Sequence, residues 1–135
     1  MPQIFVDTSA WVALFDEKDR NFKTATDFFQ ELNQPLLTTN FILNETITLV
    51  RCRVSHKLAV EVAKKFYAGK MAALSYITPA EEADALRLFE KYTDKTFSFT
   101  DCTSFVVMRK SGIVQSFTFD KHFRQMGFQV VPSIR

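Results

Sequence analysis

Four carboxylates of this 135-residue chain stand in positions where they could act together. Each follows an apolar run, begins a helical segment or lies within an unusually apolar helix, whereas most other acidic residues fall on polar helical faces. Carboxylates that lie close together repel one another unless a cation neutralises them. Hard oxygen ligands select Mg²⁺ or Mn²⁺, and the sequence offers no cluster of His and Cys for a softer metal. The four residues are Asp7, Glu45, Asp101 and Asp120.

A site of this kind suits the hydrolysis of phosphodiester bonds. A bound divalent ion lowers the pKa of an attacking water, and Mg²⁺ commonly meets its substrate through phosphate oxygens. A second ion about 3.5–4 Å from the first would stabilise the leaving oxygen, so the site could hold one ion or two. The pattern therefore predicts a metal-dependent hydrolase.

Each acid also has a purely structural explanation. An Asp between a strand and a helix is a common N-cap that stabilises the helix by about 0.5–2 kcal/mol, and this is the favoured interpretation of Asp101 or Asp120 taken alone. Glu45 could equally lie on the outer stripe of its helix. The set is harder to explain in this way, because the carboxyl ends of parallel strands share one edge of a sheet. Asp7 and Asp120 meet at that edge if their strands are neighbours.

The segments that must position these acids alternate between strand and helix. Apolar runs rich in β-favouring residues alternate with segments that carry apolar residues every three or four positions. The alternation predicts an α/β fold with a parallel sheet covered by helices on both faces, in a single domain over residues 1–135. The expected strands are 4–6, 36–38, 72–77, 114–119 and 128–131, and the expected helices are 10–15, 21–33, 40–54, 58–67, 79–92, 100–112 and 121–126.

Capping residues indicate where several of these helices begin and end. Asn40 is a candidate N-cap, and Thr78 begins a capping box in which Pro79 is the first helical residue and Glu81 the reciprocal partner. All three glycines fall where the end of a helix favours a positive φ. The helix after Thr78 is expected to pack through Ala83, Leu86, Phe89 and Tyr92.

The composition limits the classes of protein to consider. The formal net charge of +2 does not by itself argue for a nucleic-acid partner. No apolar run approaches the roughly 20 residues of a membrane span, and the N-terminus has no signal-peptide pattern, so we expect a cytoplasmic protein without membrane contact. Cys52 and Cys102 form no paired motif and are expected to be reduced, buried thiols.

The four acids lie in the motifs Phe5-Val6-Asp7-Thr8-Ser9, Asn44-Glu45, Phe99-Thr100-Asp101 and Thr118-Phe119-Asp120-Lys121-His122-Phe123. In this order and spacing, the motifs together resemble those of the PIN-domain ribonucleases, and in particular the VapC-type toxins of toxin–antitoxin pairs. The resemblance spans residues 4–132. It implies a three-layer PIN-like fold with a five-stranded parallel sheet of strand order 3-2-1-4-5.

The resemblance also implies an activity and partners. The chain would be a Mg²⁺- or Mn²⁺-dependent endoribonuclease that cleaves RNA, forms a homodimer and is inhibited by a small cognate antitoxin. Asp7 and Asp101 would be the most direct metal ligands, and Glu45 and Asp120 would complete the site, partly through water. The adjoining hydroxyl positions, expected to orient the first acid or to hold a metal-bound water, are Thr8 and Ser9.

Other candidate residues have simpler interpretations. His122 could donate a proton or touch a phosphate, but a partly exposed place on a short helix is the favoured interpretation. Trp11 could stack on a base, although packing in the core or in a subunit interface is favoured. Lys121 and Arg124 rank first among the basic residues for binding RNA phosphates, because they lie close to Asp120 in sequence.

Two other functional classes stay open. A PIN fold could serve only as a non-catalytic RNA- or protein-binding module, although clustered charge destabilises a fold that has no use for it. A receiver-like signalling domain also gathers acids at the carboxyl edge of a parallel sheet. Such a domain would need an acidic pair at the first strand, where Asp7 is instead followed by Thr8.

Overall fold

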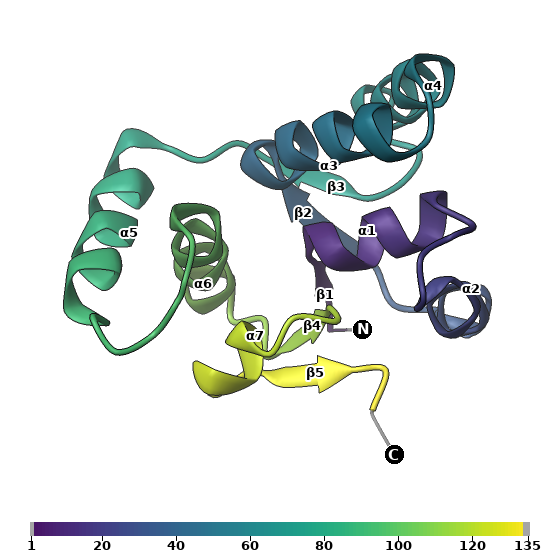
Figure 1. Cartoon of the computed structure of the whole chain (residues 1–135). Helices are drawn as coiled ribbons and strands as arrows, with labels where there is room; N and C mark the ends of the chain where they lie inside the picture. Colours follow the sequence, from purple (N-terminus) through teal and green to yellow (C-terminus); the bar gives the residue numbers. More distant parts are fainter. Residues whose placement is uncertain (1, 134–135) are drawn as a thin grey trace.

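Five strands form the centre of the structure, a computed structural model that describes residues 2–133. They are β1 (Ile4–Val6), β2 (Leu36–Thr39), β3 (Ala73–Ser75), β4 (Gln115–Phe117) and β5 (Gln129–Val131). All neighbouring strands run parallel, and their order across the sheet is β3-β2-β1-β4-β5 (Figure 1). The predicted strand order is therefore confirmed. The prediction of a single domain over residues 1–135 includes positions outside the described residues and stays a prediction.

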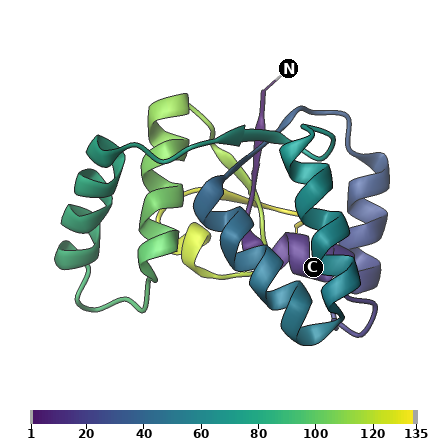
Figure 2. The same ribbon diagram turned by 90° about the horizontal axis from the view of Figure 1, so that it is seen from above.

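Helices cover both faces of this sheet. They are α1 (Thr8–Phe15), α2 (Phe22–Glu31), α3 (Asn40–Arg53), α4 (His56–Tyr67), α5 (Pro79–Lys91), α6 (Phe99–Ser111) and α7 (His122–Gln125). Helices α5 and α6 lie on one side of the sheet, and α1, α2 and α4 lie on the other (Figures 1 and 2). This arrangement is the predicted three-layer α/β fold. No helix among residues 2–133 is long and apolar enough to cross a membrane.

Strand β1 is the central strand, and its position determines which chain segments meet at the edge of the sheet. All three of its residues are buried, as expected for a strand covered on both faces. Val6 is paired with Phe117 of β4, and the amide of Asp7 continues the ladder by donating to the carbonyl of Phe117 at 3.1 Å. The residues that follow β1 and β4 are therefore direct neighbours.

Trp11 belongs to the core, as the favoured interpretation predicted. Its side chain is fully buried, and its ring lies edge-on to that of Phe66 with the ring centres 4.8 Å apart. The indole N–H donates to Thr38 Oγ1 at 3.3 Å, which satisfies the one polar atom of the ring. Stacking of Trp11 on an RNA base is thus excluded in this structure.

Several predicted element ends differ from the observed ones by one or two residues, and two of these differences concern α3 and the segment that carries Asp120. Helix α3 is capped by Thr39, whose hydroxyl accepts from the amide of Ile42 at 3.2 Å, whereas Asn40 accepts the amide of Ile77 through its side chain. Strand β4 ends at Phe117 instead of Phe119. Asp120 accordingly lies on the loop after the strand and not at the strand's end.

The packing face of α5 also differs from the prediction. The capping box at its start is present, but Leu86 and Phe89 are 49% and 47% exposed. Ala85 is buried and Leu88 is half-buried, so the helix is turned by about one residue from the expected orientation. An apolar spacing of three to four residues fixes a stripe only approximately when several neighbouring positions are apolar.

The two cysteines have different environments. Both thiols are free, but only Cys102 is buried, so the prediction of a buried Cys52 is wrong. Burial and the neighbouring charge of Asp101 raise the pKa of the Cys102 thiol to about 11. The Cys102 thiol is therefore protonated near neutral pH and acts as a core side chain.

Candidate active site

A cleft of about 640 Å³ lies next to the carboxyl ends of β1 and β4. The start of α1 and the loop after β4 both enter it because β1 and β4 are paired, and α3 and α6 close it from the sides. All six residues that the sequence singled out for this site line the cleft. They are Asp7, Thr8, Ser9, Glu45, Asp101 and Asp120.

Asp7 is buried at the junction of β1 and α1. It holds the N-cap position of α1, yet its side chain makes no capping hydrogen bond. Its Oδ2 instead accepts hydrogen bonds from Ser9 Oγ and Thr118 Oγ1, each at 2.9 Å. The carboxylate is thus oriented by two hydroxyls and is not used to stabilise the helix.

The same two hydroxyls attach the loop after β4 to Asp7. The amide of Phe119 donates to Ser9 Oγ at 2.9 Å, and the amide of Asp120 donates to Thr118 Oγ1 at 3.0 Å. Sequence reasoning missed Thr118 as a site residue. The available signal was a hydroxyl two positions before an acid, directly after a strand.

Asp101 does not cap α6 in the way that was favoured for this residue taken alone. The N-cap is Ser98, and Asp101 is its reciprocal partner in a capping box. The amide of Ser98 donates to Asp101 Oδ2 at 3.0 Å, and the amide of Asp101 donates to Ser98 Oγ at 2.9 Å. The first turn of α6 therefore fixes the carboxylate where it faces the cleft.

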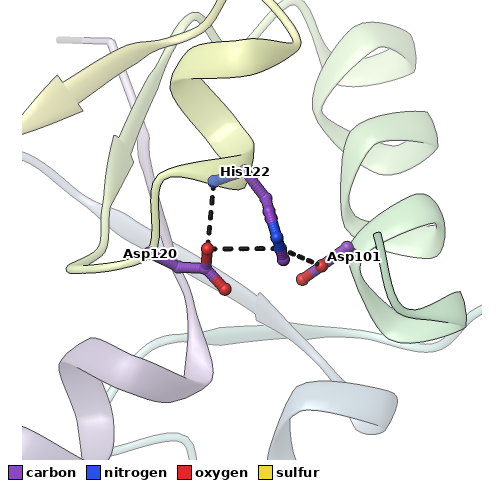
Figure 3. Close-up of side chains that lie close together, drawn as sticks. All are labelled: Asp101, Asp120 and His122. Carbon is purple, nitrogen blue, oxygen red and sulfur yellow. Dashed lines mark hydrogen bonds and ion pairs between the residues drawn. The ribbon is translucent and has the colours of Figure 1, made fainter. Parts of the chain in front are cut away.

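His122 lies between two of the acids, although sequence reasoning set it aside (Figure 3). It begins the short helix α7, and its side chain is 14% exposed. Its Nδ1 is 2.7 Å from Asp101 Oδ2 and 3.2 Å from Asp120 Oδ1. Its backbone amide also donates to Asp120 Oδ1 at 3.0 Å. Its place two residues after an acid was the only sequence signal for this contact.

Each of the three aspartates keeps one oxygen available. Asp7 and Asp101 accept their hydrogen bonds through Oδ2, and Asp120 accepts through Oδ1. Within residues 2–133, no hydrogen bond reaches the second oxygen of these carboxylates. Half of each carboxylate is therefore fixed by the protein, and the other half is free to bind a ligand in the cleft.

Burial and mutual repulsion raise the pKa values of two of the acids. Burial raises the pKa of Asp7 to about 7, with a further rise from the charge of Asp101, against the lowering effect of the Thr118 and Ser9 hydroxyls. Burial likewise raises the pKa of Asp101, and the charge of Asp120 adds to this effect. Both shifts arise because a buried carboxylate loses hydration and meets a second negative charge.

A divalent cation fits these residues. The open carboxylate oxygens are hard ligands of the type that Mg²⁺ and Mn²⁺ prefer. Thr8 Oγ1 is buried beside Asp7 and has no hydrogen-bond partner among the described residues, so it can accept or donate to a water in the cleft. Glu45, half-buried on α3, adds a further carboxylate to the lining.

Basic residues line the same cleft and form what we call the basic wall, Arg20, Arg53 and Lys121. All three are exposed. Arg53 Nη1 is 3.9 Å from Asp19 Oδ2, which is a long ion pair. Lys121 lies where the sequence suggested, whereas Arg124 is absent from the lining and Arg20 was not considered.

Comparison with known proteins identifies the fold. Residues 4–129 match the family model of the PIN domain. The chain is 35% identical to the 23S rRNA-specific endonuclease VapC20 of Mycobacterium tuberculosis, over 93% of this chain and 95% of the relative. The crystal structure of VapC20, a sarcin–ricin loop cleaving toxin, matches over the same shares with a TM-score of 0.88.

A second solved structure shows how far the fold extends beyond close relatives. FitAcB from Neisseria gonorrhoeae matches with a TM-score of 0.64 over 94% of this chain and 95% of that chain. The identity is only 14%, so this likeness concerns the fold alone.

The fold, the acidic cleft and these matches show that the chain belongs to the PIN-domain family. Within that family it is a VapC-like ribonuclease of the toxin type, as the sequence motifs predicted. The receiver-like alternative is thereby excluded.

Proposed function

We propose that this protein is a metal-dependent endoribonuclease in which Asp7, Asp101 and Asp120 hold Mg²⁺ or Mn²⁺, with Glu45 completing the site. One observation carries the proposal: three carboxylates in one cleft each keep an oxygen free of hydrogen bonds from the described residues. A non-catalytic binding module has no physical need for such oxygens, because uncompensated buried charge destabilises the fold.

The protein's own residues orient the three carboxylates of the site. Ser9 and Thr118 hold Asp7, the capping box of Ser98 holds Asp101, and the amide of His122 holds Asp120. A divalent ion bound there would lower the pKa of a water and stabilise charge that develops on the phosphate oxygens. Thr8 Oγ1 has the hydrogen-bonding capacity to orient that water.

The basic wall is proposed to bind the RNA backbone. Phosphate contacts from Lys and Arg dominate nucleic-acid affinity and carry no sequence information of their own. Arg20, Arg53 and Lys121 line the cleft that contains the acids, so RNA phosphates held by them would lie beside the carboxylates. This arrangement supplies positive charge to a pocket that would otherwise repel RNA.

The proposed substrate is a structured loop of ribosomal RNA. VapC20 is a 23S rRNA-specific endonuclease that cleaves the sarcin–ricin loop, and it shares 35% identity over nearly the whole chain. We also propose, from the same relationship, that the chain is the toxin of a pair, with a small antitoxin as its inhibitor. The homodimer and the cytoplasmic location stay predictions.

The test is cleavage of 23S ribosomal RNA and of an isolated sarcin–ricin hairpin by the purified protein, with Mg²⁺, Mn²⁺ or EDTA. Asp7→Asn and Asp101→Asn keep the side-chain shape and remove a charged ligand. Asp94→Asn is the matched control, because Asp94 is an exposed loop residue that contacts Lys95.

We expect a defined cut that needs the metal, is lost in both cleft variants and persists in the control. Cutting that continues in EDTA, or in both cleft variants, would contradict the metal mechanism. Cutting of 23S RNA outside the hairpin would retain the nuclease and reject the proposed loop.

A further inference from the structure

We propose that His122 Nδ1, together with Asp101 Oδ2 and Asp120 Oδ1, forms a mixed nitrogen–oxygen metal position that takes Mn²⁺ in preference to Mg²⁺. The proposal rests on the metal site of the proposed function and adds a ligand whose chemistry differs from that of the carboxylates. It concerns the oxygens that His122 already contacts, as seen in Figure 3.

The distances from His122 Nδ1 to the two carboxylate oxygens are close to the spacing of adjacent ligands on one ion. Nδ1 is 2.7 Å from Asp101 Oδ2 and 3.2 Å from Asp120 Oδ1, and the three side chains offer ligand atoms that all lie within 4.8 Å of one another. Around an octahedral ion with bonds of about 2.1 Å, adjacent ligands lie about 3 Å apart and opposite ligands about 4.2 Å apart. Small side-chain shifts would therefore admit an ion.

The second ring nitrogen is held in a way that suits ligation by the first. Nε2 is 3.1 Å from Thr96 Oγ1, a hydroxyl that can accept an N–H bond. In the structure, the 2.7 Å contact of Nδ1 with Asp101 Oδ2 is a hydrogen bond, so a bound ion would take the place of the proton in that contact. The remaining ring proton would then be on Nε2, where Thr96 Oγ1 can accept it. Histidine ligands in proteins commonly donate their other N–H to such a partner, which fixes the tautomer.

Packing restrains the ring in the same orientation. Phe97 lies edge-on to the His122 ring, with ring centres 5.4 Å apart and an interplanar angle of 82°. His122 also lines the cleft that contains the acids. Two consecutive residues, Thr96 and Phe97, thus hold the His122 ring, while Nδ1 faces the carboxylates.

The nitrogen donor determines which ion is favoured. Mg²⁺ prefers oxygen ligands and retains its waters, whereas transition-metal ions accept imidazole nitrogen alongside carboxylate oxygen. The site therefore discriminates through His122, and the carboxylates alone would not produce this preference.

The experiment uses the purified full chain, with Mn²⁺ as the probe. Pulsed electron paramagnetic resonance detects coupling between bound Mn²⁺ and a ring nitrogen, and calorimetry measures the affinities for Mn²⁺ and Mg²⁺. His122→Gln removes the ligand, and His56→Gln is the matched control because His56 is exposed at the start of α4. The chain contains no other histidine.

We expect nitrogen coupling in the natural protein and in His56→Gln, and its loss in His122→Gln. The affinity of His122→Gln for Mn²⁺ should fall by at least about tenfold, and its affinity for Mg²⁺ should change much less. Because the coupling is measured first in the natural protein, the proposal can fail even if His122→Gln does not fold.

Bound Mn²⁺ without nitrogen coupling would overturn the proposal and leave the proposed nuclease intact. Equal losses of Mn²⁺ and Mg²⁺ affinity in His122→Gln would also overturn it, since His122 would then only position the acids. A natural protein that binds no Mn²⁺ would overturn both the ligand assignment and the metal site of the proposed function.

Discussion

The cleft has two chemically opposite regions, and they are built differently. The acidic floor, Asp7, Asp101 and Asp120, is buried or half-buried, and every carboxylate is fixed through one oxygen by hydrogen bonds of 2.7–3.0 Å. The basic wall, Arg20, Arg53 and Lys121, is exposed, and its one ion pair within the described residues is long, at 3.9 Å.

The difference reflects what each region must do. Stabilising charge in a transition state requires groups that are already oriented, because reorientation during the reaction costs free energy. Attracting a flexible polyanion requires charge in the right area but little geometry, since phosphate contacts are numerous and interchangeable. Variants of the floor should therefore alter the rate of cleavage, and variants of the wall should alter RNA binding.

The largest effect is expected at the floor. Asp101→Asn should lower the rate at saturating RNA by about 10³-fold, because a preorganised charged group is lost. Binding of RNA without metal should be unchanged or tighter, since one negative charge leaves the cleft. Single-turnover cleavage and fluorescence anisotropy measure the two quantities. A loss of rate matched by an equal loss of binding would contradict the division between floor and wall.

The second effect concerns stability in the absence of metal. The pKa of Asp7 in the folded protein is raised from 3.8 to about 7, so folding favours its protonated form. The stability that this group contributes is complete below pH 4 and is lost as the pH rises to about 7. The free energy of unfolding should fall by up to roughly 4 kcal/mol over this interval.

Urea unfolding in EDTA at a series of pH values tests this effect. Asp7→Asn should show a much weaker dependence on pH between 4 and 7, and Mn²⁺ should restabilise the natural protein at pH 8 but not the variant. Identical pH profiles for the two proteins would show that Asp7 is not the group responsible.

A smaller effect is expected when the acidic floor loses an orienting hydroxyl but no charge. Thr118→Val removes the donor to Asp7 Oδ2 and the acceptor for the amide of Asp120. Partners of this kind typically contribute 10–100-fold to metal affinity or activity, so cleavage should fall by about that factor. The control is Thr26→Val, whose hydroxyl donates to the carbonyl of Phe22 on α2. An effect no larger than that of the control would argue against orientation by Thr118.

The smallest effect is expected at the wall. Arg53→Ala or Arg20→Ala should raise KM about tenfold with little change in kcat. Each should also reduce the slope of log RNA affinity against log salt concentration by about one. Arg87→Ala provides the matched control, because Arg87 is exposed on α5 and pairs with Asp84. A fall in kcat without a change in KM would place the arginine in the chemistry and not in binding.

Much of the fold could be predicted from the sequence because its signals are local. The capping box at Thr78, the glycines at the ends of helices and the alternation of apolar runs each depend on residues a few positions apart. The convergence of Asp7 and Asp120 also followed from sequence, since neighbouring parallel strands bring their carboxyl ends together. The strand order came from the resemblance of the motifs to those of the PIN-domain ribonucleases.

The errors arose where local signals are ambiguous or absent. Asn40 and Thr39 are both residue types that cap helices well. The segment after β3 lies beside the start of α3, and Asn40 accepts the amide of Ile77 from that segment, so Thr39 is the cap. Leu86 and Phe89 have the spacing of a buried face, but the neighbouring helix determines which stripe of α5 is covered.

The sequence by itself determined the alternating strands and helices, the acids and the edge of the sheet where they gather. Only the tertiary structure decided how those acids are held. The bond between Thr118 and Asp7 joins residues 111 positions apart, and the contact between His122 and Asp101 joins residues 21 positions apart. Such contacts depend on how β4 and α6 pack beside β1, and no periodicity or spacing along the chain records that packing.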